Sequence, residues 1–418
     1  MPAIGNSKPA GTSTTPRSRF QRSAARARRS ATSAAASFCC MVRSVAISRR
    51  SLPARVYAGG DPPAPLPHAA GDSMNARATN LTLFFLLLLE LISGLASFLA
   101  GSPEGRWIFW LHSAGGLSIV VLLVWKWRIV VRSFARRGAG LWSLAPALLG
   151  VLFLGILLTG LWWLLVGRGT LLVPFYGEMR PLVLHTILGL ALVPFFALHV
   201  LLRWPRRPTA AFASRRAVLR LFAVGAGGFA ISRGLAIAAP HSGPDRRFTG
   251  SREEASFTGN AHPVTNWLFD NRQRISRDEW RLEVRGEVRE PLTLDYDELT
   301  ALAERTRRAT LDCTGGWYTV QDWSGVPLAA VLERAGLTDD AHSVVVTSAT
   351  GFSRRFGLGT VPRLLLATQV GGERLSTGHG FPVRLVAPGR RGYNWVKWVV
   401  SIEVSHRPGW WQSPLPTQ

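Results

Sequence analysis

The run Thr310-Leu-Asp-Cys-Thr-Gly-Gly-Trp317 contains Cys313, the only cysteine in the chain beyond Cys40. A free thiol in an oxidising compartment is chemically vulnerable unless it is buried or bound. One interpretation of Cys313 is therefore a small buried hydrophobic residue. Its neighbours favour another interpretation, because a strand-like run that ends in Cys and continues with Gly-Gly is typical of a ligand on a loop. We expect Cys313 to be a ligand.

Three further motifs follow Cys313 along the chain. They are Trp323-Ser-Gly-Val-Pro-Leu328, His379-Gly-Phe-Pro-Val-Arg-Leu-Val-Ala-Pro388 and Gly392-Tyr-Asn-Trp-Val-Lys-Trp398. In this order, Cys313 and the motifs resemble the molybdopterin-binding domain of the sulfite oxidase family, over roughly residues 250–405. The resemblance implies a molybdenum ion bound to molybdopterin, with the soft thiolate of Cys313 as the catalytic protein ligand to the metal.

The resemblance also implies a buried pocket for the pterin, whose phosphate is held by cationic side chains and backbone donors. The residues implied in this sequence are Asn260, His262, His379, Arg384 and Lys397. Arg offers a planar fork of donors to phosphate oxygens, and Lys offers a compact charge. The alternative for each is an ordinary surface side chain. Sulfite oxidases add arginines that hold the oxyanion substrate. The candidates for that role are Arg307, Arg308, Arg354 and Arg355.

The positive charge of the chain is concentrated on its N-terminal side. The whole sequence carries 49 Lys and Arg against 25 Asp and Glu, whereas residues 241–418 hold 22 basic and 20 acidic residues. Basic residues at the flanks of apolar runs are typical of membrane proteins, which keep these charges on the cytoplasmic side. We therefore expect membrane lipid, and no nucleic acid, among the partners of this protein.

Residues 1–73 are rich in Ser, Ala, Arg and Pro and show little hydrophobic periodicity. Such a segment cannot bury enough apolar surface to offset the entropy of ordering, so we expect a disordered basic tail. Met74 stands directly before the first long apolar run, which leaves open whether the tail is expressed at all. An organelle transit peptide is a further alternative.

Four apolar stretches follow, and each is long enough to cross the hydrocarbon core of a bilayer as a helix. They lie near residues 80–100, 107–130, 143–166 and 181–203. We expect residues 74–210 to form an all-α transmembrane bundle in the inner membrane. The segments after the second and fourth stretches are strongly basic, which predicts that they and the N-terminus are cytoplasmic.

A fifth apolar run lies within residues 211–241 and opens with Ser214-Arg-Arg-Ala-Val-Leu-Arg220. This opening resembles a twin-arginine export signal, except that Val218 stands where such signals usually have Phe. The alternative is the basic flank of an ordinary fifth transmembrane helix, although Arg233 interrupts the run. A domain with an organic metal cofactor must be loaded in the cytoplasm and exported folded. The helix count also predicts a periplasmic C-terminal domain.

Beyond the fifth run, the pattern changes to short alternations of apolar and polar residues, such as residues 280–285 and 343–347, broken by Gly and Pro. These alternations predict strands. Amphipathic helices are expected near residues 327–335 and 361–369. Residues 242–418 are enough to enclose a core of their own, so we expect a soluble α+β domain.

Three histidines lie in the apolar stretches: His112 in the second, and His185 and His199 in the fourth. The last two are fourteen positions apart, which is about 21 Å along a helix and close to one face of it. Such a pair resembles the haem ligands of four-helix b-type cytochromes, which implies that these histidines bind haem iron, with His112 facing His185 near the outer surface. A hydrogen bond in helix packing is the alternative for each.

Lys126 stands where the second stretch would carry a fourth haem histidine, fourteen positions after His112. It is a cytoplasmic anchor, a rare axial ligand or the mark of a lost second haem. The number of b-type haems, one or two, therefore stays open.

These patterns predict a membrane-anchored molybdenum oxidoreductase with its own b-type haem. We expect oxygen-atom transfer on a small substrate outside the membrane, with electrons exchanged with quinone, quinol or another carrier. Sulfite-type oxidation and reduction of a sulfoxide or N-oxide both fit the sequence. The competing hypothesis is a haem-only electron conduit whose metal-free outer domain binds a partner.

Overall fold

The computed structural model describes residues 76–137, 144–167, 169–174, 177–203, 215–238, 245–266 and 273–413. The tail expected over residues 1–73 lies outside these ranges, and so does Ser214 at the start of the twin-arginine-like run. The described residues belong to one compact unit.

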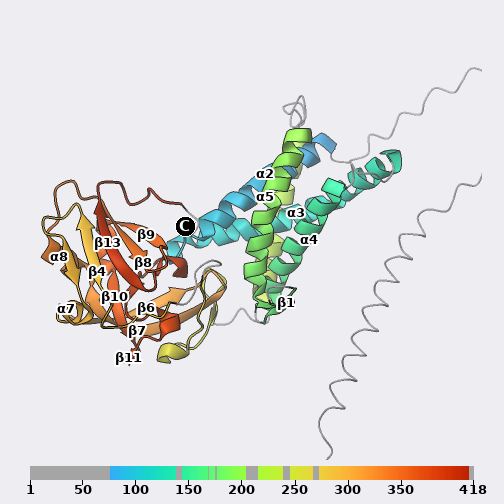
Figure 1. Ribbon diagram of the computed structural model, residues 1–418. Helices are drawn as coiled ribbons and strands as arrows, with labels where there is room; N and C mark the ends of the chain where they lie inside the picture. Colours follow the sequence, from blue (N-terminus) through green and yellow to red (C-terminus); the bar gives the residue numbers. More distant parts are fainter. Residues whose placement is uncertain are drawn as a thin grey trace, which may run out of the picture. The chain divides into compact units, whose positions relative to one another are not determined.

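Long helices dominate the N-terminal half of the described chain (Figure 1). They are α2 (Ala76–Ser97), α3 (Arg106–Arg137), α4 (Leu144–Leu165), α5 (Pro181–Arg203) and α6 (Arg215–Ala238). Among the described residues, these five helices are long and apolar enough to cross a membrane. The first four correspond to the four predicted apolar stretches, and α6 corresponds to the fifth run.

Helix α3 lies at the centre of one helical group, because α2 and α6 both pack against it. A buried apolar cluster joins the three helices and contains Leu83, Ile119, Leu122 and Val224. The hydroxyl oxygens of Ser113 on α3 and Ser232 on α6 lie 2.5 Å apart, and Ser118 donates to the carbonyl of Val224 over 3.3 Å. Small hydroxyl residues allow such close approach of apolar helices. Helix α5 packs against α4.

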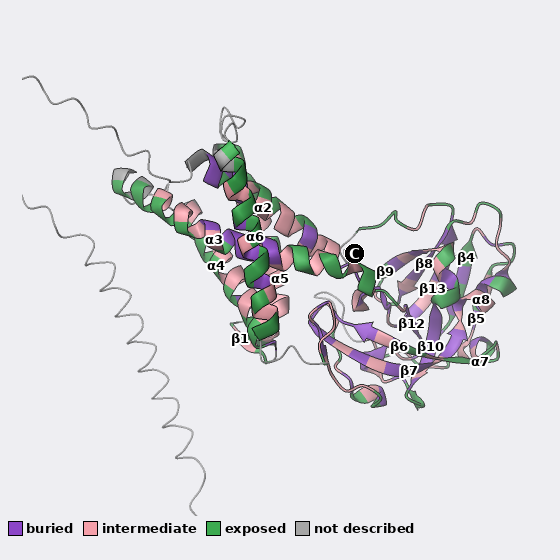
Figure 2. Cartoon of the chain, turned by 180° about the vertical axis from the view of Figure 1, so that it is seen from behind, coloured by how far each residue is buried: buried purple, intermediate pink, exposed green. Residues whose placement is uncertain are grey.

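The outer surfaces of these helices are apolar and open, whereas the strands of the C-terminal half enclose a buried core (Figure 2). Leu201 on α5 is 79% exposed, and Val151 on α4 is 68% exposed. Contiguous apolar surface of this extent is rare on water-soluble monomers. It favours lipid as the surroundings of the helices.

Two sheets form the scaffold of the described residues 245–413. The first contains β3 (Arg252–Glu253), β6 (Arg305–Asp312), β7 (Trp317–Pro327), β10 (Leu365–Val370), β11 (Glu373–Arg374) and β12 (Arg384–Val386). The second contains β4 (Leu282–Gly286), β5 (Leu292–Leu294), β8 (Ser343–Ser348), β9 (Ser353–Gly357) and β13 (Val399–Ser405). A separate hairpin between α4 and α5 consists of β1 (Leu171–Val173) and β2 (Gly177–Met179).

Strand β7 organises the first sheet, because it pairs with β3, β6 and β10. Its antiparallel register with β6 runs from Arg305 opposite Gly325 to Asp312 opposite Tyr318, which sets Cys313 in the turn that joins the two strands. In the second sheet, β13 lies between β4, its parallel neighbour, and β8, its antiparallel neighbour. Both sheets contribute to one buried apolar core.

The short helices cap and connect these strands. They are α7 (Tyr296–Thr300) and α8 (Leu328–Ala335), and the 3₁₀ helices η1 (Pro103–Gly105), η4 (Gly259–Ala261), η5 (Leu358–Arg363), η6 (Thr377–His379) and η7 (Gly392–Asn394). Helix α8 confirms the helix predicted near residues 327–335.

The helix predicted near residues 361–369 is wrong, because this segment contains the end of η5 and most of strand β10. Its residues from Leu364 to Thr368 are all buried. A short run that is buried on every side has no periodicity that separates a strand from a helix. The general prediction of a sheet-rich α+β domain after the apolar helices is nevertheless confirmed.

Candidate functional site

Cys313 is buried in the turn between β6 and β7. Its N–H donates to the carbonyl of Trp317 over 2.8 Å, and its own carbonyl accepts from the N–H of Gly316 over 3.1 Å. Gly316 has φ of +90°, a conformation that favours glycine. The N–H of Gly315 donates to Sγ of Cys313 over 3.3 Å. The Gly-Gly pair therefore shapes the turn and also contacts the sulfur.

Burial raises the pKa of the Cys313 thiol, and the hydrogen bond from Gly315 opposes this shift only in part. The isolated thiol is therefore protonated at neutral pH. A bound metal would favour the thiolate directly, because coordination removes the proton from sulfur.

The sulfur of Cys313 faces a pocket of about 90 Å³, which brings four of the predicted cofactor residues together. They are His262, His379, Arg384 and Lys397. Asn260, the fifth, is not among the residues that line the pocket. Its side chain accepts from the N–H of Ser376 and donates to the carbonyl of Arg374, each over 2.8 Å. Asn260 thus fixes the loop that leads to His379.

His262 and His379 form one wall of this pocket, with ring centres 4.0 Å apart. Nε2 of His379 donates to the carbonyl of His262 over 2.9 Å, and its Nδ1 accepts from the Ser376 hydroxyl over 2.7 Å. Burial, followed by the proximity of His379, lowers the pKa of His262 to about 3, so its imidazole is neutral at pH 7. The buried Nε2 of His262 has no hydrogen-bond partner among the described residues. A buried polar atom in that position costs about 1–3 kcal/mol, which a polar cofactor would recover.

Arg384 brings a buried positive charge to the same pocket and is only 2% exposed. Its guanidinium donates to the carbonyl of His379 over 3.1 Å and lies 5.0 Å over the indole of Trp323. Burial lowers the pKa of Arg384 to about 9, which still leaves it cationic at neutral pH. Its buried Nε has no hydrogen-bond partner among the described residues.

Lys397 supplies the second cation. Its Nζ donates to the side-chain carbonyl of Asn266 over 2.6 Å, and to the main-chain carbonyls of Gly378 and Thr265 over 2.8 and 3.1 Å. The described lining of the pocket contains no Asp or Glu. The pocket therefore offers two cations, a neutral histidine and two buried nitrogen atoms without hydrogen-bond partners among the described residues. Such a lining fits an anionic, polar group such as a pterin phosphate.

The four arginines considered for an oxyanion are not among the residues that line this pocket. Arg307 donates to the carbonyl of Arg363, Arg308 pairs with Asp322, Arg354 donates to the side chain of Asn394, and Arg355 donates to the hydroxyl of Ser343. Each therefore has a hydrogen-bond partner within the domain, and Arg354 also lies 4.8 Å over the ring of Tyr393, which lines the pocket.

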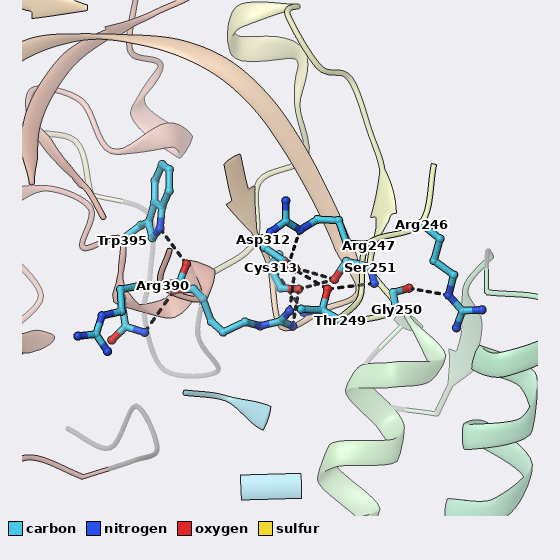
Figure 3. A network of polar contacts seen from close by, with 12 residues as sticks. Arg246, Arg247, Thr249, Gly250, Ser251, Asp312, Cys313, Arg390 and Trp395 are labelled. Carbon is cyan, nitrogen blue, oxygen red and sulfur yellow. Dashed lines mark hydrogen bonds and ion pairs between the residues drawn. The ribbon is translucent and has the colours of Figure 1, made fainter. Parts of the chain in front are cut away.

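Asp312, the residue directly before Cys313, is the centre of a network of polar contacts (Figure 3). Its buried carboxylate accepts hydrogen bonds from Ser251 (2.7 Å), Arg391 (2.8 Å), Thr249 (2.9 Å) and Arg247 (3.0 Å). Arg391 also donates to the carbonyl of Cys313 over 3.2 Å. The sequence did not predict this network. A carboxylate at the end of a buried strand was the available signal, but its partners could not be identified.

A larger cavity of about 560 Å³ lies among helices α2 to α6 and is lined by His112 and His185. Their ring centres are 6.1 Å apart. Nδ1 of His185 donates to the carbonyl of Ile156 over 2.9 Å, and Nδ1 of His112 lies 3.0 Å from the Ser93 hydroxyl and 3.1 Å from the Glu90 carboxylate. Metal-bound histidines usually hold their second nitrogen in this way, which leaves Nε2 as the ligand atom.

The separation of the two rings also fits a shared metal. Imidazole nitrogens bind a metal at about 2 Å, so ring centres 6.1 Å apart would allow His112 and His185 to hold one metal together. Gly94 and Gly160 allow the rings to pack against their neighbours, since a Cβ there would lie 3.3 Å from His112 and 3.2 Å from His185. Glu90 was not among the predicted site residues, although an acidic residue within an apolar run indicates a function.

His199 and Lys126 are not among the residues that line this cavity. Lys126 donates to the side chain of Asn80 on α2 over 2.8 Å. A role of His199 at a second haem therefore stays a prediction. Among the described residues, no group of three or more His, Cys, Asp or Glu side chains is arranged to hold a metal ion.

Comparisons with known proteins give matches to one family, to a protein and to a solved structure. Residues 270–411 match the family described as "Oxidoreductase molybdopterin binding domain". The chain is 29% identical, over 251 residues, to the protein-methionine-sulfoxide reductase catalytic subunit MsrP of Burkholderia mallei (strain ATCC 23344). This alignment covers 50% of this chain and 76% of that protein. Among solved structures, the sulfane dehydrogenase SoxCD of Paracoccus pantotrophus is 27% identical over 32% of this chain, with a TM-score of 0.32. The match covers 40% of that SoxCD chain.

Proposed function

We propose that the chain, a molybdopterin-dependent oxidoreductase of the sulfite oxidase family, reduces a sulfoxide or N-oxide outside the membrane with electrons from quinol. His112 and His185 would hold the b-type haem through which these electrons reach the molybdenum site. The helices anchor the enzyme in the inner membrane.

The observation that carries the proposal is the pocket at Cys313. The thiolate of Cys313 would hold the molybdenum, and Arg384, Lys397 and His262 would hold the anionic and polar groups of the pterin. When bound, the molybdenum cofactor supplies two-electron oxygen-atom transfer. The protein supplies a buried, positively charged site that excludes water and orients the cofactor against the Cys313 turn.

Reduction is favoured over sulfite-type oxidation by two findings. The similar protein of Burkholderia mallei is called a methionine-sulfoxide reductase catalytic subunit. The four arginines considered for an oxyanion all bind other partners. The reaction balances when a sulfoxide, two protons and two electrons give a sulfide and water, because one quinol supplies two electrons and two protons.

A haem relay is supported by the spacing of His112 and His185 and by the hydrogen bonds at both Nδ1 atoms. A haem held by these two histidines would supply one-electron transfer, which would link quinol to the two-electron chemistry of the molybdenum cofactor. Both histidines lie within seven residues of the starts of α3 and α5.

We infer the topology from the basic flanks of the helices. An odd number of spans places the two ends of the helical region on opposite sides of the membrane, and five candidate helices are described. With the basic segments after α3 and α5 in the cytoplasm, the C-terminal domain is periplasmic.

The test is metal analysis and a reduced-minus-oxidised visible spectrum of the purified full chain. We expect molybdenum and b-type haem in the wild type, and dye-linked reduction of a sulfoxide or N-oxide. Cys313→Ser should lose molybdenum-dependent turnover and keep its haem spectrum, because the two sites use different residues.

Haem without molybdenum in the wild type would favour a haem-only conduit. Turnover of sulfite alone would reverse the proposed direction, and wild-type turnover in Cys313→Ser would refute the metal ligand.

A further inference from the structure

We propose that Arg233 and Arg246 bind the two propionate groups of the haem. This inference rests on the haem proposed between His112 and His185. Both arginines line the cavity that contains the two histidines. They add positive charge to the wall of the cavity, which matches the anionic edge of a haem.

Arg233 interrupts the apolar sequence of α6, and a charged residue within such a helix is costly unless it has a function. The hydroxyl oxygens of Ser232 and Ser113 lie 2.5 Å apart, and this contact sets the position of the neighbouring Arg233 along α3. Ser113 follows His112 directly, so Arg233 lies at the level of that ring. Its guanidinium lies 5.3 Å over the ring of Trp110. Among the described residues, no carboxylate pairs with Arg233.

Arg246 lies at the end of α4, on the side of His185. Its Nη1 donates to the carbonyl of Leu164 and its Nε donates to the carbonyl of Gly250, each over 3.3 Å. Leu164 is one helical turn beyond Gly160, the residue that packs on the His185 ring. Main-chain carbonyls do not neutralise a charge, and no carboxylate of the described residues pairs with Arg246. Burial and a nearby arginine both lower the pKa of Arg246, which is the environment of a cation without a compensating anion.

Two other arginines of the cavity wall are already engaged. Arg247 and Arg391 both donate to the carboxylate of Asp312, and thus belong to the support of Cys313. Glu90 is the acidic residue of the described wall, and it contacts His112 instead of an arginine. The wall therefore leaves two cations without an anion, the number that two propionates require.

The chemistry of recognition is specific. A haem has an apolar ring and two carboxylates at one edge, and Arg binds a carboxylate through two parallel N–H donors. The propionate edge would then face the chain segment that contains Arg246. Thr314, the neighbour of Cys313, lines the same cavity. This orientation directs the carboxylate edge of the haem toward the turn that carries the molybdenum ligand.

The experiment compares two ligands. The full chain is purified without haem and titrated in detergent with haem or with haem dimethyl ester, whose propionates are uncharged, and binding is measured by the Soret absorbance. Wild-type protein should bind haem about tenfold or more tighter than the ester, as charge-assisted hydrogen bonds predict. Arg233→Gln with Arg246→Gln should abolish that preference and leave the affinity for the ester unchanged. Arg-to-Lys variants at both positions should retain part of it.

Arg220→Gln is the matched control, since Arg220 lies on the same helix α6 but does not line the cavity. It should keep the full preference for haem. A double Gln variant that still prefers haem would overturn this inference and leave the haem site intact. An equal loss of both ligands would also overturn it, because the arginines would then act through the fold. If the wild type binds neither ligand, the proposed haem itself fails.

Discussion

Asp312 is buried between two arginines and two hydroxyl groups, directly beside the predicted molybdenum ligand. The network spans the chain, since Arg247 precedes Asp312 by 65 positions and Arg391 follows it by 79. A buried charge of this kind is stabilised only while its partners remain. The position of Cys313 therefore depends on residues that no local motif contains.

We expect Asp312→Asn to destabilise the C-terminal domain. The amide removes the negative charge and presents N–H donors to Arg247 and Arg391, which leaves buried cations uncompensated. The loss, on the order of 3 kcal/mol, corresponds to a melting temperature lower by about 10 °C. Thermal denaturation of the purified variant, with its molybdenum content, measures the effect. Asp340→Asn, at an exposed carboxylate, should match the wild type. An unchanged melting temperature in Asp312→Asn would remove the structural role assigned to this network.

At the scale of elements, the long apolar helices were predictable because few structures other than a membrane helix accommodate about 20 consecutive apolar residues. Strand β10 was not predictable, because its short apolar run is buried on every side. The residues around Cys313 could be identified because they lie in recognisable motifs. The partners of Asp312, and the pairing of Arg246 with the end of α4, depend on contacts between distant segments, which the sequence does not reveal.

Helix α6 provides a test of the export signal. Replacing Arg215 and Arg216 by Lys keeps the positive charge that sets membrane topology but removes the guanidinium groups of a twin-arginine motif. We expect α2 to α5 to insert normally while the C-terminal domain stays in the cytoplasm. Protease added outside the inner membrane should then fail to reach that domain. The same change at Arg136 and Arg137, at the end of α3, should leave export unaffected. A domain that protease still reaches in the α6 variant would contradict the twin-arginine interpretation.

At the scale of the whole molecule, the turn at Cys313 contacts the helices that surround the histidine cavity. A Cβ on Gly315 would lie 3.4 Å from the Cys313 sulfur and 3.7 Å from Val183 on α5. A Cβ on Gly316 would collide with the indole of Trp163 on α4. Val183 is only two positions before His185, so the predicted metal ligand and a predicted haem ligand are separated by few side chains. This proximity is what an electron relay within one chain requires.

The relay predicts different effects of the three histidines. Replacing His112 or His185 by Ala should remove the haem and reduce quinol-linked turnover to background, because electrons from the membrane no longer reach the molybdenum site. Turnover with a soluble dye should persist, because the dye delivers electrons to the C-terminal domain directly. His199→Ala is the matched control on α5: it should keep the outer haem and quinol-linked turnover, and would affect only a second haem. Haem content and both activities are measured in each variant. Full haem content with full quinol-linked turnover in His112→Ala would exclude the relay. His112, whose ring centre lies 6.1 Å from that of His185, would then be needed neither for haem binding nor for electron transfer.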